Sequence, residues 1–193
     1  MATQEQQRVK TPGAKQPLDL SNYELVPADG ATSVSSQELD LDLAVAKLFG
    51  ISGTKPEAVV RAVSKTWAFT GKISTAAGEP VATLEDLTIT ATKVDDPHTG
   101  RPFIHVALDF FATSHGWRTG RGVSGEPYGM SNRIYFKNSA GGVVWAMDLP
   151  VFVLGCGWHR EHQTYFGIDR YNVGWFDVCQ GVQHEVRGVI FRC

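Results

Sequence analysis

The chain has 193 residues, with 18 Lys and Arg against 20 Asp and Glu, so its formal net charge is −2. This length is enough for one domain with a substantial core. The near balance of charge argues against a general attraction to nucleic acid or to an anionic membrane surface. Twenty glycines, ten phenylalanines and five tryptophans favour turns and aromatic packing, as in β structure.

The cysteines and the first residues bear on the expected location. Cys156, Cys179 and Cys193 are odd in number and form no closely spaced pair, which does not indicate a disulfide framework. Residues 1–17 hold no apolar run, so neither a secretory signal nor a membrane span is predicted. We expect a cytoplasmic protein with reduced thiols.

Residues 1–34 are predicted to form an extended arm. They are rich in Gln, Pro, Thr, Ala and Ser, and large apolar side chains are few. Leu18, Leu20, Tyr23, Leu25 and Val26 are their apolar anchors. We expect Leu18–Val26 to dock as an extended segment on a sheet edge or an apolar groove, of its own chain or of a neighbouring chain.

Residues 35–193 are predicted to form a single β-rich domain that begins with a helical hairpin over 35–66. Ser35-x-x-Glu38 and Thr54-x-x-Glu57 match the capping box. Apolar residues at helical spacing follow each box. They are Leu41, Ala44, Val45 and Leu48 after the first box, and Val59, Val60, Val63 and Trp67 after the second. Val63 and Trp67 are therefore expected to be buried.

Part of this hairpin resembles the helix–turn–helix of bacterial repressors. The resemblance covers about twenty residues, from Val45–Ser52 to Val59–Val63, and departs from the pattern where residues 53–56 lengthen the turn. It would imply DNA binding. However, the first helix carries acidic residues and the second has no basic face, so packing against β structure is the favoured interpretation.

After Trp67 the apolar period changes to two, which predicts strands. The clearest alternations are at 87–92, 104–110, 133–137 and 143–147, and further strands are expected around 67–75, 151–158, 163–168, 173–179 and 183–192. Seven or eight strands at this spacing predict a mainly β protein, an antiparallel β-sandwich or β-barrel.

The segment GCGWHREH, Gly155–His162, combines a thiol, an indole and two imidazoles. As a helix it would place His159 and His162 on one face, as half of a metal site. As a strand it would place His159 and Glu161 on one side and Trp158, Arg160 and His162 on the other. The polar string 159–163 between apolar runs favours a hairpin tip, and no metal ligand set is predicted.

Two other regions could hold a ligand. Residues 114–131 predict a long glycine-rich loop, in which Arg118 and Arg121 could meet an anionic group and Trp117 and Tyr128 could stack on a ring. The alternative is a solvated excursion. Asp109 interrupts an apolar strand and shares a face with His105, which lies about 13 Å away at strand rise. A dyad at Asp109 would therefore need a partner from an adjacent strand.

These patterns favour a non-enzymatic binding or interaction protein that recognises a small molecule, a glycan or a partner protein. The expected ligand-binding residues are Trp117, Arg118, Arg121, Tyr128, His105 and Asp109. One alternative is a self-assembling subunit linked by the arm. The other is an enzyme with a polar site around His105 and Asp109, or around His159, Glu161 and His162. No cofactor is implied, and nucleic acid is not an expected partner.

Overall fold

The computed structural model describes residues 22–40, 59–74, 78–96, 99–117, 132–155, 157–186 and 189–192. Only the backbone is described at 22, 28–40, 59–61, 116–117 and 190–192. These residues are mostly β structure. This confirms the predicted fold class at the level of a mainly β protein with antiparallel sheets.

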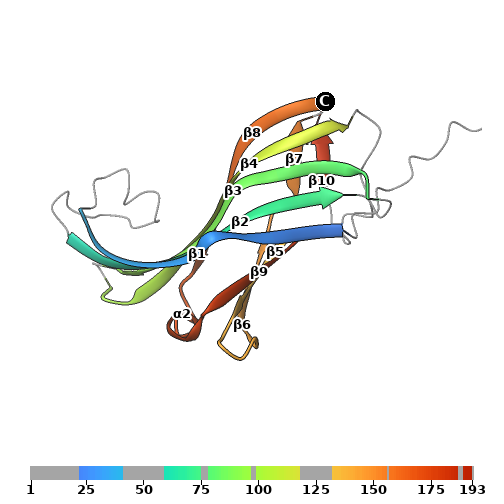
Figure 1. The fold of residues 1–193 in the computed structure, drawn as a ribbon. Coiled ribbons are helices and arrows are strands. Elements are labelled where there is room, and N and C mark those ends of the chain that lie inside the picture. The colour runs from blue at the N-terminus through green and yellow to red at the C-terminus, as the bar shows by residue number, and fades with distance from the viewer. Residues whose placement is uncertain are drawn as a thin grey trace, which may run out of the picture.

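Five long strands form one layer (Figure 1), in the order β1-β2-β3-β4-β8, and every neighbouring pair is antiparallel. Their bounds are β1 Asn22–Asp40, β2 Val59–Ser74, β3 Pro80–Asp95, β4 Pro102–Trp117 and β8 Gly157–Asp169. The face that meets the second layer is called the inner face below, and the opposite face is called the outer face.

In Figure 1, the β5, β6 and β9 strands of the second layer lie below the five-stranded sheet, whereas β7 and β10 are seen at the height of β3 and β4. A three-stranded antiparallel sheet has the order β6-β5-β9, with β5 Asn132–Lys137, β6 Val143–Leu149 and β9 Gly181–Val186. A parallel pair joins β7, Phe152–Gly155, to β10, Val189–Arg192. A single helical turn, α2, spans Trp175–Val178.

One hydrophobic core lies between the two layers, because alternate residues of each strand point inward. A bulge in β3, where Asp86 has a positive φ of 51°, keeps both Leu84 and Leu87 on the inner face. Phe110 of β4 packs against Phe152 of β7 with ring centroids 4.8 Å apart. The largest fully buried side chains are Phe110, Phe136, Phe152, Ile73, Leu84, Leu87, Ile89, Ile104, Leu108, Ile134 and Leu154.

The helix α2 is joined to this core by rings and by one lysine. The Trp175 ring stacks on Trp145 at 4.6 Å and lies 4.5 Å from Phe136. Lys65 points inward from β2 and donates hydrogen bonds to the carbonyl oxygens of Phe176 and Cys179, at 2.6 and 2.8 Å. These carbonyls belong to the end of a helix, where no intrahelical donor remains for them.

The predicted helical hairpin over 35–66 is wrong in its described parts. Residues 35–40 complete β1 and residues 59–66 begin β2, paired antiparallel with each other, while residues 41–58 lie outside the described residues. Positions 59, 63 and 67 are four apart, and this even spacing puts them on one face of a strand as well as of a helix. Branched valines then favour the strand. Trp67 is buried and Val63 is partly buried against the core, as expected.

Two further expectations need correction. The barrel alternative is wrong for the described strands, since β1 and β8 are the two edges of the five-stranded sheet and do not pair; the second layer covers the inner face instead. The strand expected at 173–179 is replaced by a turn and α2. There the Asp169 carboxylate accepts hydrogen bonds from the backbone N–H groups of Tyr171 and Asn172 and from Trp175 Nε1.

Part of the arm is an edge strand of this chain. β1 begins at Asn22, runs across the expected boundary at residue 34, and pairs with β2. Tyr23 and Leu25 pack against the core, whereas Leu18 and Leu20 lie outside the described residues.

Candidate functional site

A row of aromatic, imidazole and charged side chains follows the outer face of β4 and β8. Alternation sends the odd-numbered residues 105–115 of β4 outward, and their partners on β8 are even-numbered. His162 lies opposite Phe111, and Trp158 lies opposite His115. We call this row the outer-face strip; it consists of His105, Asp109, Phe111 and His115 on β4 and Trp158, Arg160, His162 and Phe166 on β8.

The centre of the strip is a carboxylate–imidazole pair. His162 Nε2 donates to Asp109 Oδ1 at 2.7 Å, and the Thr164 hydroxyl donates to Asp109 Oδ2 at 3.1 Å. Both members of the pair are about half exposed. The hydrogen-bond partner of Asp109 thus lies on the adjacent strand β8, as the sequence pattern required for a dyad at this position.

Two planar polar side chains lie close to the ring of Phe111. The Arg160 guanidinium carbon lies 4.0 Å from the centroid of the Phe111 ring, and the His162 ring lies 4.9 Å from it. Glu85 of β3 accepts a hydrogen bond from Arg160 Nε at 3.1 Å and another from Thr113 at 3.3 Å. The positive charge of the strip is therefore compensated from within the sheet.

Exposed aromatic rings mark both ends of the strip. Trp158 is 78% exposed and meets His115 edge-on at 5.3 Å, while Phe166 is 51% exposed and lies 5.4 Å from the His105 ring. His105 is itself buried, and this burial lowers the pKa of its imidazole. Large apolar rings this exposed are informative because most residues of this type lie in cores.

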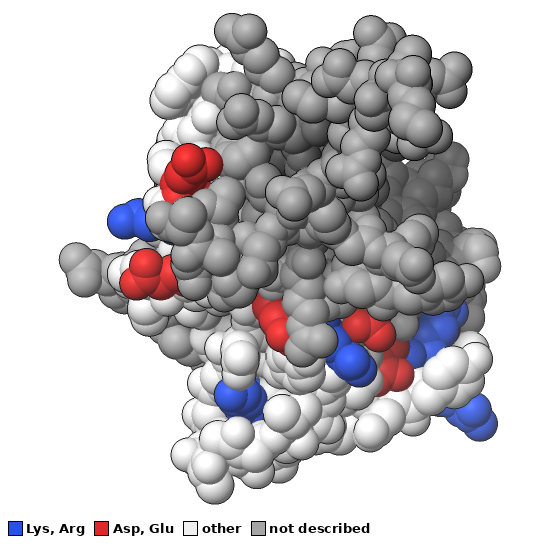
Figure 2. All heavy atoms as spheres, turned by 90° about the vertical axis from the view of Figure 1, so that its right-hand side faces the viewer, with Lys and Arg blue, Asp and Glu red and all other residues white. Residues whose placement is uncertain are grey.

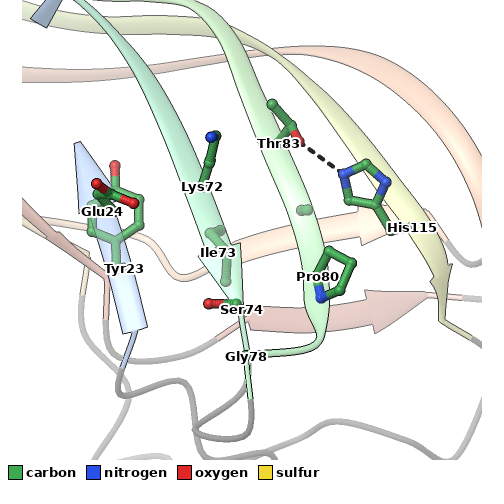
Figure 3. Close-up of a pocket in the computed structure, with 10 residues that line it drawn as sticks. Tyr23, Glu24, Lys72, Ile73, Ser74, Gly78, Pro80, Thr83 and His115 are labelled. Atoms are coloured by element: carbon green, nitrogen blue, oxygen red, sulfur yellow. Dashed lines mark hydrogen bonds between the residues drawn. The ribbon is translucent and has the colours of Figure 1, made fainter. Parts of the chain in front are cut away.

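A pocket of about 690 Å³ lies where β1, β2 and β3 begin or end (Figure 3). It is lined by Tyr23, Glu24, Lys72, Ile73, Ser74, Gly78, Pro80, Ala82, Thr83 and His115. His115 Nε2 and the Thr83 hydroxyl are hydrogen bonded at 2.8 Å. Because His115 belongs to both, the pocket adjoins the Trp158 end of the strip.

Only two of the six predicted ligand-binding residues can be placed with their side chains. His105 and Asp109 both lie on the strip. Trp117 is the last residue of β4, with its backbone alone described, and Arg118, Arg121 and Tyr128 lie outside the described residues.

The alternative site of His159, Glu161 and His162 is not brought together. His162 faces outward, while Glu161 faces inward and accepts a hydrogen bond from the backbone N–H of Gly155 at 2.7 Å. The inward Ser114 hydroxyl also bonds the backbone of this region, at the carbonyl oxygen of Gly155. Glu161 therefore holds the start of the β7–β8 connection.

The expected hairpin tip at residues 159–163 is wrong, because these residues lie inside β8. Gly157, the first residue of β8, has a φ of +75°, which suits a glycine. β8 is an edge strand with one solvent-facing side, so it accepts a polar string that would be costly in a central strand.

The described residues contain no group of three or more His, Cys, Asp or Glu placed to hold a metal ion. In the same residues, no helix is long and apolar enough to cross a membrane. On the face in Figure 2, the described acidic and basic side chains are intermixed and form no patch of one sign.

Sequence reasoning missed most of the strip. Arg160, Trp158 and His162 were placed on one side of a possible strand, but the hairpin-tip interpretation set that pattern aside. A continuous strand over 157–169 would have shown the outward series Trp158, Arg160, His162, Thr164, Phe166 and Ile168. Glu85 and Phe111 carried no signal that could link them to β8.

A buried histidine lies on the other side of the sheet. His184 of β9 bonds the Tyr23 hydroxyl through Nδ1 at 2.7 Å and Asn132 Oδ1 through Nε2 at 2.5 Å. Asn132 Nδ2 in turn donates to the carbonyl oxygen of Pro150. Burial lowers the pKa of His184 to about 3 and raises that of Tyr23. This network joins the two layers.

No family model, curated protein sequence or solved structure matches this chain. The functional argument therefore depends on the geometry of the strip and the pocket.

Proposed function

We propose that this protein binds an extended, uncharged glycan along the outer-face strip and does not transform it. The observation that carries the proposal is the exposure of Trp158 and Phe166 at the two ends of a continuous row of ring and planar polar groups. Positions 158 and 166 are eight residues apart, which is about 26 Å at strand rise. That length suits an oligomeric ligand.

The residue types of the strip support a hydroxyl-rich ligand. Exposed ring faces can cover the apolar C–H faces of sugar rings, while carboxylate, imidazole and guanidinium groups bond hydroxyls between them. Arg160 forms an ion pair with Glu85, and His162 is hydrogen bonded to the Asp109 carboxylate. A strip compensated in this way offers little attraction to a polyanion such as nucleic acid.

A partner protein is the less favoured occupant. A protein interface of standard size would remove the Arg160–Glu85 ion pair and the Asp109 carboxylate from water, and the cost of that desolvation can exceed the energy of the contacts themselves. Sugar hydroxyls can instead replace the water molecules that such half-exposed groups bind. Arg118, Arg121 and Tyr128, which follow β4 in the sequence, remain part of this proposal as further contacts.

Catalysis is disfavoured by the setting of the Asp109–His162 pair. General acid–base groups work best in an enclosed site beside a nucleophile or a second acid. Here the pair lies half exposed on the face of a sheet. Beside the two members themselves, the group that joins the pair is the Thr164 hydroxyl, and it already donates its hydrogen bond to Asp109. Self-assembly through the arm is disfavoured because Tyr23 and Leu25 pack in the core of their own chain.

The proposal is tested by affinity electrophoresis and titration calorimetry against neutral polysaccharides built of glucose, xylose, mannose or N-acetylglucosamine. We expect at least one polymer to bind the wild type, and Trp158→Ala to weaken that binding about tenfold, within the range found for aromatic anchors. Tyr171→Ala is the matched control, since Tyr171 is 99% exposed in the turn after β8 and is not part of the strip.

Two results would overturn the proposal. One is the absence of binding to every polymer of the panel. The other is equal loss, or no loss, of binding in the Trp158 and Tyr171 variants. Release of reducing sugar from a bound polymer would contradict the non-enzymatic part of the proposal, and loss of this release in Asp109→Asn would assign it to the pair.

A further inference from the structure

The pocket and the strip share the outer face of the same sheet. Glu24 of β1 lies opposite Lys72 of β2, and Lys72 lies opposite Thr83 of β3. Thr83 lies opposite Thr113 of β4, and His115, two residues further along, points to the same side. Glu24, Lys72, Thr83 and His115 therefore form a row across four strands, and Figure 3 shows them around the pocket.

His115 joins this row to the strip. One edge of its ring bonds the Thr83 hydroxyl in the pocket, and the ring meets the exposed Trp158 indole at 5.3 Å on the other side. A chain that follows the strip to Trp158 and there turns across the sheet over His115 therefore reaches the pocket. The pocket volume of about 690 Å³ falls within the range of about 300–1,000 Å³ that is usual for small-ligand sites.

The pocket offers both hydrogen-bond donors and acceptors, and the opposite charges of Glu24 and Lys72 cancel. Glu24 supplies a carboxylate and Lys72 an ammonium group, both exposed, and among the described residues neither forms an ion pair within 4 Å. Thr83 and the Nδ1 atom of His115 add polar groups that can donate or accept. Pro80, which is exposed, adds an apolar side chain.

We propose that this pocket receives the terminal sugar unit of the glycan, so that the protein recognises chain ends as well as the chain. This inference rests on the proposed function, because it takes the ligand of the strip as its starting point. Vicinal hydroxyls of a terminal sugar can bond Lys72 as acceptors and Glu24 as donors at the same time. An internal sugar, linked at both ends, lacks one of the free hydroxyls that a terminal sugar offers to these groups.

The test uses hexasaccharides of the polymer that binds in the panel, with either a free or a fluorophore-blocked end, prepared separately for the two ends of the chain. For the wild type, we expect blocking one of the two ends to weaken binding about tenfold, the order expected when a hydrogen bond to a charged group is lost. In Lys72→Ala, free and blocked hexasaccharides should bind equally. Lys137→Ala on β5 is the matched control and should behave like the wild type.

The two proposals fail in different ways. If neither blocked form is weakened in the wild type, or if Lys72→Ala keeps the difference, the pocket does not receive a chain end. In that case Trp158→Ala would still test the strip, because loss of this ring should weaken the binding of free and blocked chains alike. If no polymer binds the wild type, the strip proposal fails and the pocket proposal fails with it.

Discussion

Acidification from pH 7.5 to pH 5 should destabilise the fold through His184. Its imidazole is buried between the layers, bonded to Tyr23 and Asn132, and burial lowers its pKa from 6.5 to about 3. The unfolded chain binds a proton at this site below pH 6.5, whereas the folded chain stays neutral down to about pH 3. The unfolded state therefore gains protons first, and the free energy of unfolding falls as the pH falls through this window.

The size of the effect follows from the distance between the working pH and the unfolded pKa. At pH 5 the solution is about 1.5 units below 6.5, and each unit corresponds to roughly 1.4 kcal/mol, so His184 alone should remove about 2 kcal/mol. Its contribution to stability is fully present above pH 6.5. The loss continues to increase until the pH reaches the folded pKa.

Urea unfolding followed by tryptophan fluorescence measures this loss in the wild type and in His184→Gln, which cannot titrate at that position. The quantity compared is the change in the free energy of unfolding between the two pH values, because the substitution also changes stability at neutral pH. His105, whose pKa burial also lowers, is present in both proteins, so its contribution cancels in the comparison. Equal changes in both proteins would refute the reasoning.

Three further predictions concern the core and are measured by the same unfolding assay at pH 7.5. Lys65→Met should lower the free energy of unfolding by about 1–3 kcal/mol, because two helix-end carbonyls lose their donor. Its control is Lys93→Met, which removes an exposed ion pair with the same helix and should cost less than about 1 kcal/mol. Equal costs would contradict the role of Lys65. Trp67→Ala should cost roughly 3–5 kcal/mol as a large-to-small core change, and a cost below about 1 kcal/mol would show that the site is not part of the core. Tyr23→Phe should cost about 1–3 kcal/mol, since it leaves a buried imidazole nitrogen without its partner; Tyr171→Phe, fully exposed, should be neutral, and an equal cost would argue against the network.

The strands that could be predicted are those in which two-residue alternation met one buried face. Ile89 and Ala91 of β3 and Ile134 and Phe136 of β5 are buried at every second position, with partly exposed residues between them. This period is a local property of the chain. It therefore needs no knowledge of the partner strands.

The helical hairpin could not be rejected from the same kind of pattern. Capping boxes and apolar residues four apart agree with a helix, but the spacing is equally compatible with one face of a strand. Pairing of residues 59–74 with β1 and β3 decided the matter, because it satisfies the backbone of β2 on both sides.

The candidate site could be predicted even less than the hairpin, because it depends on the register between β4 and β8. The sequence identified Asp109 as a carboxylate that needs a partner from an adjacent strand. It placed His162 on the same side as Trp158 and Arg160 if their segment is a strand. Their contact joins residues 53 positions apart. Only the pairing of β4 with β8 brings them to 2.7 Å, since a shift of one residue would send one of them to the opposite face.

The sequence by itself determined which residues favour strands, that the charge is near neutral, and that the glycine and aromatic content favours β structure. The tertiary structure decided which of those side chains remain exposed. Local alternation assigns a residue to one of two faces, but whether that face meets a second layer or solvent depends on packing between segments distant in sequence. The inner face became the core and the outer face kept Trp158 and Phe166 in solvent because β5, β6 and β9 cover one side of the five-stranded sheet.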